Sequence, residues 1–420
     1  MLLAMIVAKL ARVVTRLRGG GSAFPGLVLL RLQPKVLEKT LGALPGGVVF
    51  VTGSNGKSTT TAMLATLLRH HGVRVFSNPA GGNLPQGLAS AVVASATLTG
   101  RVKADIAVLE VDEAYGPQIS DLLRPDWVVV TNIQLDQLNR FGEPEHVFDL
   151  IHTLASRAKQ GLVVNSGDPN LVVLGGRIQA TGLQTHTVGI SETATARQAH
   201  GLVPAPLSFD DEVSLDGDPV ATLVDCVGTV ATVEAGGSVM DVAIPVPGLH
   251  YGVDAALAIG VGALLLGGKI RQSATVDAFA SGQPVYGRGE VISYRGRELA
   301  ITMQKNLPSL QVNMAAMTEP AERVWVAVDE GTPDPSWIFD ADLSMLDHVD
   351  VLTGTKAPQW ALLLEYRGIP YGQIIYDTQA ALDHITSLPH NSTPIRAILN
   401  DEQMMLVRRL AGYKDLEGAT

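Results

Sequence analysis

The sequence predicts an α/β protein built on a mostly parallel sheet with helices on both faces. Short β-branched runs alternate with segments of helical spacing from Gly47 onward, an order typical of parallel sheets. Polar residues follow several of the runs directly, and ligands of parallel sheets gather where the strands end. The first predicted strands are residues 48–52, 73–76, 106–111 and 127–131, and a helix is expected over 59–70.

The length of 420 residues predicts more than one domain. We expect a helical segment at 1–45, a central α/β domain at 46–282 and a C-terminal α/β domain at 283–420. Helical spacing disappears between about 199 and 243, which predicts a small antiparallel β insertion, and it returns over 253–266. In the last domain, strands are predicted at 291–294, 324–328 and 349–352, and helices at 359–366 and 378–387.

Charge and cysteine content exclude some classes of protein. The net charge of −10 argues against a nucleic-acid partner. A single cysteine, Cys226, excludes an intrachain disulfide and a cysteine-rich zinc site, so no structural zinc is expected. This cysteine content fits a reducing cytoplasm.

Residues 1–18 carry apolar residues at helical spacing, interrupted by Lys9, Arg12, Arg16 and Arg18. The charges lie inside and after the apolar run, whereas a signal peptide places them before it. The run is also too short and too charged to cross a bilayer. Two interpretations stay open: a helix packed on its own protein, or peripheral contact with the inner face of the cell membrane.

The strongest motif is Val-Thr-Gly-Ser-Asn-Gly-Lys-Ser-Thr at 51–59, which follows a predicted strand and opens a predicted helix. Glycines let the backbone N–H groups curl around phosphate oxygens, and the helix N-terminus adds partial positive charge. Lys57 would contact the terminal phosphates, and the Ser58 hydroxyl would bind Mg²⁺. The predicted ATP-binding residues here are Gly53, Ser54, Asn55, Gly56, Lys57, Ser58 and Thr59.

Two further polar clusters follow predicted strands. Glu110 lies one residue before the end of the run at 106–111, and Asn132 and Asp136 follow the run at 127–131. A carboxylate beside a triphosphate can bind Mg²⁺, because this hard cation prefers oxygen. Glu110 is therefore predicted to bind Mg²⁺ together with Ser58, and the alternative for either cluster is a solvated loop.

These motifs, in this order, resemble the Mur ligase superfamily, which shares the short form of the phosphate loop with folylpolyglutamate synthases. Several further segments are similar to the MurT-type subunits of lipid II isoglutaminyl synthases. They are Asn-Pro-Ala-Gly-Gly-Asn-Leu at 78–84, Glu-Val-Asp-Glu at 110–113, Asp-Gln-Leu-Asn-Arg-Phe-Gly at 136–142, Gly-Arg-Gly-Glu at 287–290, Lys-Asn at 305–306, Asp-Pro-Ser-Trp-Ile-Phe-Asp-Ala-Asp at 334–342 and Thr-Gly-Thr-Lys-Ala at 353–357.

The resemblance implies a Mur-ligase-like central P-loop ATPase domain followed by a Rossmann-like C-terminal domain. It implies ATP and Mg²⁺ as cofactors, and amidation of the D-glutamate α-carboxylate in the lipid II stem peptide through an acyl phosphate. The ammonia would come from a GatD-type glutamine amidotransferase subunit. The site residues implied are Lys57, Glu110 and Asp334 for catalysis, Asn132, Asp254 and Arg288 for ATP, and Asn83, Asp136, Lys305 and Asn306 for substrate.

The resemblance gives Asp334 a specific role, as the acidic residue that completes a cysteine–histidine glutaminase site on the partner subunit. A third group of this kind holds the histidine in the right tautomer and stabilises its charged form. The alternative is that Asp334 caps a helix that starts near Ser336, since aspartate is a favoured capping residue.

The sequence also departs from the family pattern. Tyr251 and Asp254 stand where two asparagines usually contact adenine, and Gln137 stands where most Mur ligases have a magnesium-binding histidine. No lysine occurs between Lys103 and Lys159, so the carbamylated lysine of classical Mur ligases is absent. Two other functions therefore stay open: a ligase that joins an amino acid to another carboxylate, such as a folate, and a nucleotide-binding scaffold without catalysis.

Overall fold

The computed structural model describes residues 1–17, 23–79, 82–136, 143–197, 201–209, 213–282, 288–315, 317, 320–389 and 393–413, with residues 16, 288 and 289 described in their backbone only. The chain divides into two compact units. The first comprises Met1–Gln134 and Glu143–Gln283, and the second comprises Leu135–Gly142 and Pro284–Thr420.

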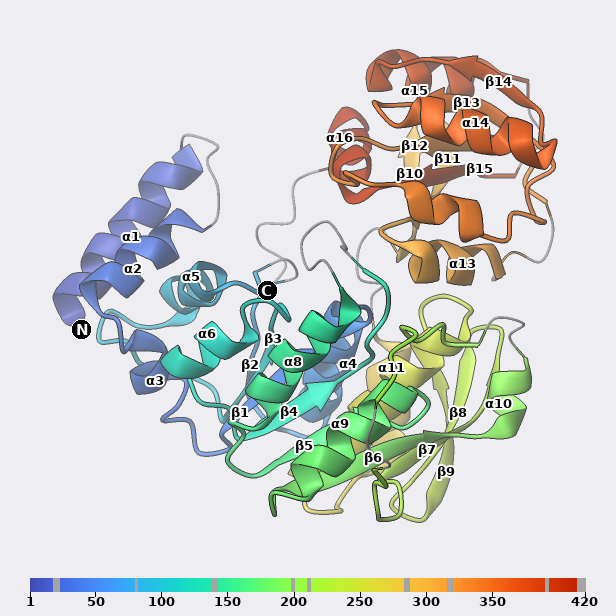
Figure 1. Cartoon of the computed structure of the whole chain (residues 1–420). Helices are drawn as coiled ribbons and strands as arrows, with labels where there is room; N and C mark the ends of the chain where they lie inside the picture. Colours follow the sequence, from blue (N-terminus) through green and yellow to red (C-terminus); the bar gives the residue numbers. More distant parts are fainter. Residues whose placement is uncertain are drawn as a thin grey trace. The chain divides into compact units, whose positions relative to one another are not determined.

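The first unit is built on a nine-stranded sheet with the order β2-β3-β1-β4-β5-β6-β7-β8-β9 (Figure 1). In this order, all neighbouring strands from β2 through β1 to β7 are parallel. Strands β8 and β9 pair antiparallel at one edge of the sheet. Their bounds are β1 Val48–Thr52, β2 Val75–Phe76, β3 Ile106–Glu110, β4 Trp127–Val130, β5 Gly161–Asn165, β6 Gln184–Ile190, β7 Ala221–Val227, β8 Val230–Ala235 and β9 Ser238–Ala243.

Helices cover both faces of this sheet, with α6, α8 and α9 on the near face and α4 and α11 behind it in Figure 1. Every residue of β1 is buried, as expected for a central parallel strand. Val49 and Val51 pack with Leu64 of α4 in one hydrophobic core. The helices are α4 Lys57–His70, α5 Pro85–Ser95, α6 Gly116–Leu122, α8 Pro144–Ala155, α9 Pro169–Gln179, α10 Glu192–Ala196, α11 Leu249–Leu265 and α12 Gln272–Ala280.

Three helices precede the sheet in the first unit: α1 Leu2–Leu17, α2 Phe24–Leu32 and α3 Val36–Thr40. Helix α2 approaches α5 closely at Gly26, whose N–H donates to the Ser90 hydroxyl at 2.8 Å. A Cβ atom on Gly26 would lie 1.9 Å from the Gln86 carbonyl oxygen, so only glycine permits this approach. None of the helices that the structure describes is both long and apolar enough to cross a membrane.

The second unit contains a six-stranded sheet with the order β10-β11-β15-β12-β13-β14, in which only β10 is antiparallel to its neighbour. Alternate residues of β12 face two separate cores: Val324 and Val326 pack with α13 and α14, and Trp325 packs with α15 and α16. The elements are β10 Arg288–Tyr294, β11 Arg297–Met303, α13 Leu307–Ala315, β12 Val324–Ala327, η1 Ser336–Asp340, β13 Val349–Thr353, α14 Ala357–Arg367, β14 Tyr371–Ile374, α15 Thr378–Ser387, β15 Ile395–Leu399 and α16 Asp401–Leu410.

The predicted α/β class, with parallel sheets covered by helices, is confirmed, but two elements differ from expectation. The strand predicted at 73–76 shortens to Val75–Phe76. The antiparallel strands predicted at about 199–243 begin only at Ala221, and they extend the main sheet, because β7 pairs in parallel with β6. Buried Ala221 and Leu223 of β7 share the hydrophobic core of the first unit with Val188 of β6, which joins this region to the sheet.

Asp168 connects α9 to the chain that follows β4. Its carboxylate accepts the N–H of Asn170 at 2.9 Å, which caps α9, and the N–H of Ile133 at 2.7 Å. The side chain is buried, and this burial outweighs the backbone hydrogen bonds and raises the pKa of Asp168 to about 6. Folding therefore stabilises the protonated form of this carboxyl group.

We predict that Asp168 makes stability depend on pH in the acid range. Because the pKa is higher in the folded chain than its ordinary value of 3.8, its contribution is fully present below about pH 4 and is lost as pH rises through about 6. The asparagine in Asp168→Asn does not titrate. It offers one hydrogen-bond acceptor fewer than the carboxylate, and this loss lowers the free energy of unfolding equally at every pH. From pH 4 to pH 7, the wild-type free energy of unfolding should fall relative to this variant by about 2–3 kcal/mol in urea unfolding. A difference that is constant across this range would contradict the prediction.

Candidate active site

The phosphate-loop motif lies between β1, which ends at Thr52, and α4, which begins at Lys57. Gly53 and Gly56 adopt φ angles of +126° and +83°, which other residues rarely reach. A Cβ atom on Gly53 would lie 2.3 Å from the Thr131 hydroxyl oxygen. The loop therefore curls at the N-terminus of α4, where helix dipoles favour an anion.

The segment that follows β4 holds this loop in place. Asn132 accepts the N–H of Ser54 at 3.0 Å through its carbonyl and the N–H of Asn55 at 2.9 Å through its side chain. Gln134 donates its N–H to the Ser54 hydroxyl at 3.0 Å and accepts the side-chain amide of Asn55 at 2.7 Å. Ser54 and Asn132, both predicted to bind ATP, thus lie at the loop, where they fix its conformation.

The Lys57 side chain is buried and turned toward the loop. Its ammonium group donates to the Glu113 carboxylate at 2.8 Å, to the Ser54 carbonyl at 3.0 Å and to the Gly53 carbonyl. Glu113 is 1% exposed, so the pair is shielded from solvent. The geometry places a fixed positive charge directly under the curled loop.

Glu110 ends β3 beside β1, where it pairs in register with Val51. Its backbone is held by Asn78, which accepts the Glu110 N–H at 2.9 Å, and its carboxylate accepts the side-chain amide of Asn83 at 3.1 Å. Ser58 occupies the first turn of α4 and is half-buried. Hydroxyl and carboxylate oxygens suit Mg²⁺, which takes few protein ligands when phosphates and water complete its shell.

Asp254, predicted to contact ATP, lies in α11 and is buried. Its carboxylate accepts the Thr60 hydroxyl at 3.0 Å. A Cβ atom on Gly56 would lie 2.3 Å from the same carboxylate, so Asp254 faces the first turn of α4. This contact supports the base of the phosphate loop, and the contact with adenine stays a prediction.

Two predicted substrate residues meet within the second unit. The Lys305 ammonium lies 2.6 Å from the Asp136 carboxylate, whose side chain is buried. Asn306, also predicted to bind substrate, accepts the Ser309 N–H at 3.0 Å and so caps α13. The side chain of Arg288 and all of Gln137 lie outside the described residues.

Asp334 is exposed in the chain between β12 and η1. Its carboxylate accepts the Ser336 N–H at 2.9 Å, and this hydrogen bond holds the pKa of Asp334 below its usual value. This bond closes a local turn before η1, whose N-cap residue is Pro335 and has no side-chain capping bond. The side chain is exposed, and its role at a glutaminase site of a partner subunit stays a prediction.

The sequence interpretation did not assign Glu113, Gln134 or Asn78 to the site. Glu113 stands three residues after Glu110 within a motif that was recognised, and its spacing beyond a predicted strand end could have identified it. Gln134 and Asn78 act through hydrogen bonds to residues 79 and 32 positions away, and no local pattern records such partners.

We predict that the Lys57–Glu113 pair contributes strongly to stability. Glu113→Ala leaves a buried ammonium without its carboxylate, and such a loss typically costs about 3 kcal/mol. Asp121→Ala is the matched control in the same unit: it breaks an ion pair with Arg157 of similar length, 2.9 Å, whose carboxylate is 67% exposed. That change should cost less than about 1 kcal/mol in urea unfolding. Equal losses from the two variants would show that burial does not strengthen the Lys57 pair.

Comparison with known proteins identifies relatives of this chain. Residues 51–262 match the Mur ligase middle domain. The MurT subunit of lipid II isoglutaminyl synthase (glutamine-hydrolyzing) from Streptococcus pneumoniae is 37% identical over 160 residues, 38% of this chain and 34% of that protein. The Staphylococcus aureus (strain N315) MurT subunit is 32% identical over 187 residues, 44% of this chain and 42% of that protein. The matches thus span about two-fifths or less of these relatives.

Solved structures share the fold at low sequence identity. MurF from Acinetobacter baumannii superposes with a TM-score of 0.67 and 18% identity, covering 92% of this chain and 80% of that one. Folylpolyglutamate synthase from Mycobacterium tuberculosis, complexed with ADP and AMPPCP, gives a TM-score of 0.66 and 16% identity, covering 97% and 99%. The middle-domain match takes in half of the chain, with the phosphate loop, Glu110 and Asp254 inside it, and on this ground the chain belongs to the Mur ligase family.

Proposed function

We propose that this chain is the synthetase subunit of an ATP-dependent amide ligase that activates a carboxylate as an acyl phosphate. One observation carries the proposal: the curled loop, the buried Lys57 ammonium and the Glu110 carboxylate meet at adjacent strand ends within a Mur ligase middle domain. A curled backbone and a fixed cation are what phosphoryl transfer needs, since catalysis there is mostly positioning and charge stabilisation.

The proposed acceptor is the α-carboxylate of D-glutamate in the lipid II stem peptide, which becomes D-isoglutamine. The likeness to MurT subunits supports this choice. The same likeness supports a GatD-type glutamine amidotransferase as the partner that supplies ammonia. We place the protein in the cytoplasm at the inner face of the cell membrane, where a lipid-linked acceptor is accessible.

In the proposed reaction, a carboxylate oxygen attacks the γ-phosphorus of ATP, the bond to the β-phosphate oxygen breaks, and ADP leaves. Lys57 stabilises the charge on the transferred phosphoryl group. Ser58 and Glu110 would hold Mg²⁺, which would supply positive charge to the phosphate groups. Ammonia then attacks the acyl carbon, phosphate departs, and the nitrogen loses a proton to give the amide.

We assign the remaining predicted residues to the two substrates. Asn132 and Asp254 would position ATP through the loop that they hold in place. The Lys305–Asp136 pair offers a cation that can bind the stem-peptide carboxylates, and its lysine side chain is 34% exposed. Asn83, bound to Glu110, and Asn306, which caps α13, would keep their neighbours in position.

We predict that Lys57 is required for ATP turnover. Lys57→Ala should lower the rate at least a hundredfold, since a charge directed at the transferring phosphoryl group is commonly worth about 3 kcal/mol or more. This variant also leaves Glu113 buried without its cation. The double change Lys57→Met and Glu113→Gln removes both charges together, so its thermal midpoint should stay near wild type while turnover is lost. More than about a tenth of the rate in either variant would contradict the assignment.

We predict that Asp334 serves the glutaminase site of the partner. Asp334→Asn, co-purified with its amidotransferase subunit, should fail with glutamine and work with a high concentration of ammonium. Asp342→Asn is the matched control, because Asp342 is also exposed and accepts the Ser344 N–H at the same 2.9 Å. Product formation should be measured by mass spectrometry with each nitrogen source. Equal activity of Asp334→Asn with both sources would contradict a role for Asp334 in the glutaminase site.

A further inference from the structure

Helix α1 turns its apolar side away from the protein. Its exposed residues recur at the three- and four-residue spacing of one helix face, and the most exposed are Leu3 at 75%, Leu10 at 60% and Leu17 at 83%. The complete exposed stripe is Leu2, Leu3, Ile6, Val7, Leu10, Val13, Val14 and Leu17. A contiguous stripe of this kind is rare on soluble proteins and marks an interaction surface.

The opposite side of α1 attaches the helix to its own unit. Ala4, Met5 and Ala8 are buried, and α1 packs against α2 and α5. The Lys9 ammonium donates to the Val93 carbonyl at 2.9 Å. The fold therefore packs the side of this helix that carries Ala4, Met5 and Ala8 and leaves the leucine-rich side exposed. Helix α2, beside it, adds Phe24, Leu27 and Leu32, which are all exposed.

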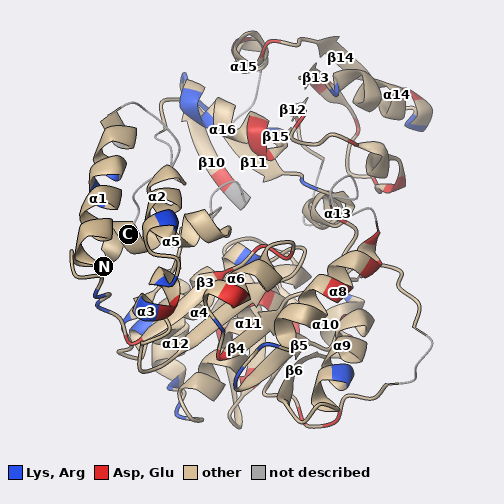
Figure 2. Cartoon of the chain, turned by 60° about the vertical axis from the view of Figure 1, so that its left-hand side comes forward, with Lys and Arg blue, Asp and Glu red and all other residues tan. Residues whose placement is uncertain are grey.

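The charges of this region have one sign. The first 37 residues carry six of the 31 Lys and Arg residues and none of the 41 Asp and Glu residues, so the rest of the chain carries 25 positive and 41 negative residues. Figure 2 shows this contrast as basic residues on α1 and α2 with no acidic residue on either helix. Helices α1 and α2 therefore carry only positive charges, although the chain as a whole has a net charge of −10.

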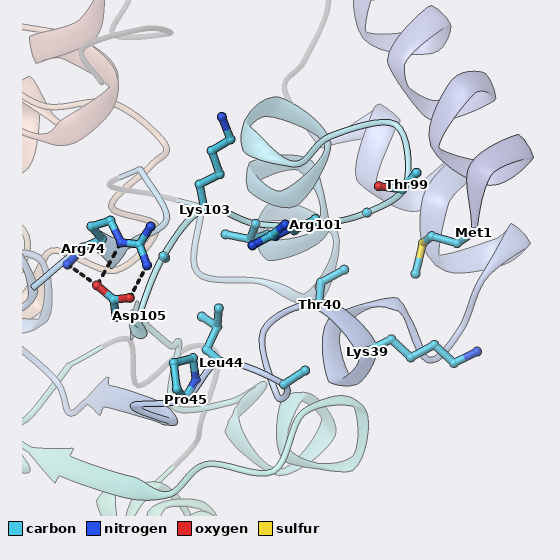
Figure 3. Close-up of a pocket in the computed structure, with 14 residues that line it drawn as sticks. Met1, Lys39, Thr40, Leu44, Pro45, Arg74, Thr99, Arg101, Lys103 and Asp105 are labelled. Carbon is cyan, nitrogen blue, oxygen red and sulfur yellow. Dashed lines mark hydrogen bonds and ion pairs between the residues drawn. The ribbon is translucent and has the colours of Figure 1, made fainter.

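A positively charged hollow of about 500 Å³ opens at the start of α1, where Met1 lines it (Figure 3). Lys39, Arg101 and Lys103 line the same hollow. Its single acidic lining residue, Asp105, accepts the Arg74 guanidinium at 3.0 Å and is thereby neutralised. This hollow extends the cationic surface beyond the helix and suits phosphate groups.

We infer that α1 lies in the plane of an anionic lipid bilayer, with its apolar stripe among the acyl chains and the neighbouring cations at the headgroup phosphates. Sixteen helical residues span only about 24 Å, which suits an in-plane helix. Charge complementarity favours an anionic bilayer as the binding partner of this surface. A second copy of the chain would bring two positive surfaces together, which opposes association. Anionic headgroups instead attract the basic residues.

The surface would deliver the enzyme to a lipid-linked acceptor, and in that respect its purpose rests on the proposed function. Vesicle binding and amidation are separate measurements, so either can fail alone. A chain that binds vesicles without amidating lipid II would leave the surface intact and remove the proposed reaction. The reverse result would remove the surface and keep the reaction.

The test is sedimentation of the full chain with vesicles of phosphatidylglycerol or of phosphatidylcholine. We expect binding to phosphatidylglycerol that is at least tenfold tighter than binding to phosphatidylcholine, and weaker at high salt. The triple change Leu3→Ser, Leu10→Ser and Leu17→Ser should reduce binding at least tenfold. The control is Leu362→Ser with Tyr366→Ser, which alters two equally exposed apolar residues of α14 and should bind like wild type.

A reporter tests insertion itself. Leu10→Trp adds a fluorophore within the stripe, and its emission should shift to shorter wavelength with phosphatidylglycerol vesicles. Three results would overturn the inference: no vesicle binding by the wild-type chain, equal binding by the triple variant, or emission that does not shift. A wild-type dimer in gel filtration that the triple variant loses would assign the surface to a second copy instead. Unchanged ATP turnover of the triple variant in solution would confirm that its fold is intact.

Discussion

The hydrogen bonds between the phosphate loop and the segment after β4 are the constraint on which the site depends. Gly53 approaches Thr131 so closely that no side chain fits, and Asn132 and Gln134 then bind the loop through backbone and side-chain atoms. Because β4 and β3 flank β1 in the sheet, the same alignment brings Glu110 to the loop. Asp168 extends the arrangement by binding the N–H of Ile133. The geometry of the phosphate site thus depends on the order of the strands in the sheet as well as on the residues of the motif.

Much of this could be predicted from the sequence, because strands and helices have local patterns. The run at 48–52 and the helix at 378–387 have the bounds that were expected. Pairing could not be predicted in the same way: Ala221 and Leu223 look alike whether β7 joins the main sheet or a separate insertion. The Glu113 partner of Lys57 lies 56 residues away, so its identity depends on the fold. The sequence therefore predicts the residues of the motifs, but it does not predict most of the residues that form hydrogen bonds with them.

Helix α1 illustrates a second limit. The spacing of its apolar residues predicts which side of the helix is apolar, and globular proteins usually bury that side. Here the buried side carries Ala4, Met5 and Ala8, and the leucines of α1 remain exposed. A sequence pattern predicts the polarity of each face of a helix. Which face is buried depends on the shape of the elements that pack against the helix. The structure shows that α1 packs on α2 and α5, and contact of its exposed side with a membrane stays a proposal.

In the Lys57–Glu113 ion pair beneath the phosphate loop, the Glu113 carboxylate is the counterion of the lysine. In the proposed reaction, an entering triphosphate would take the place of the Glu113 carboxylate at the Lys57 ammonium, so one anion would replace another. Dissolved salt screens such an exchange less than it screens the capture of an anion by an unpaired cation. On the same proposal, the carboxylate would bind the ammonium again as ADP departs, which would favour release of the product. Glu113 would then set how tightly the enzyme retains its spent nucleotide.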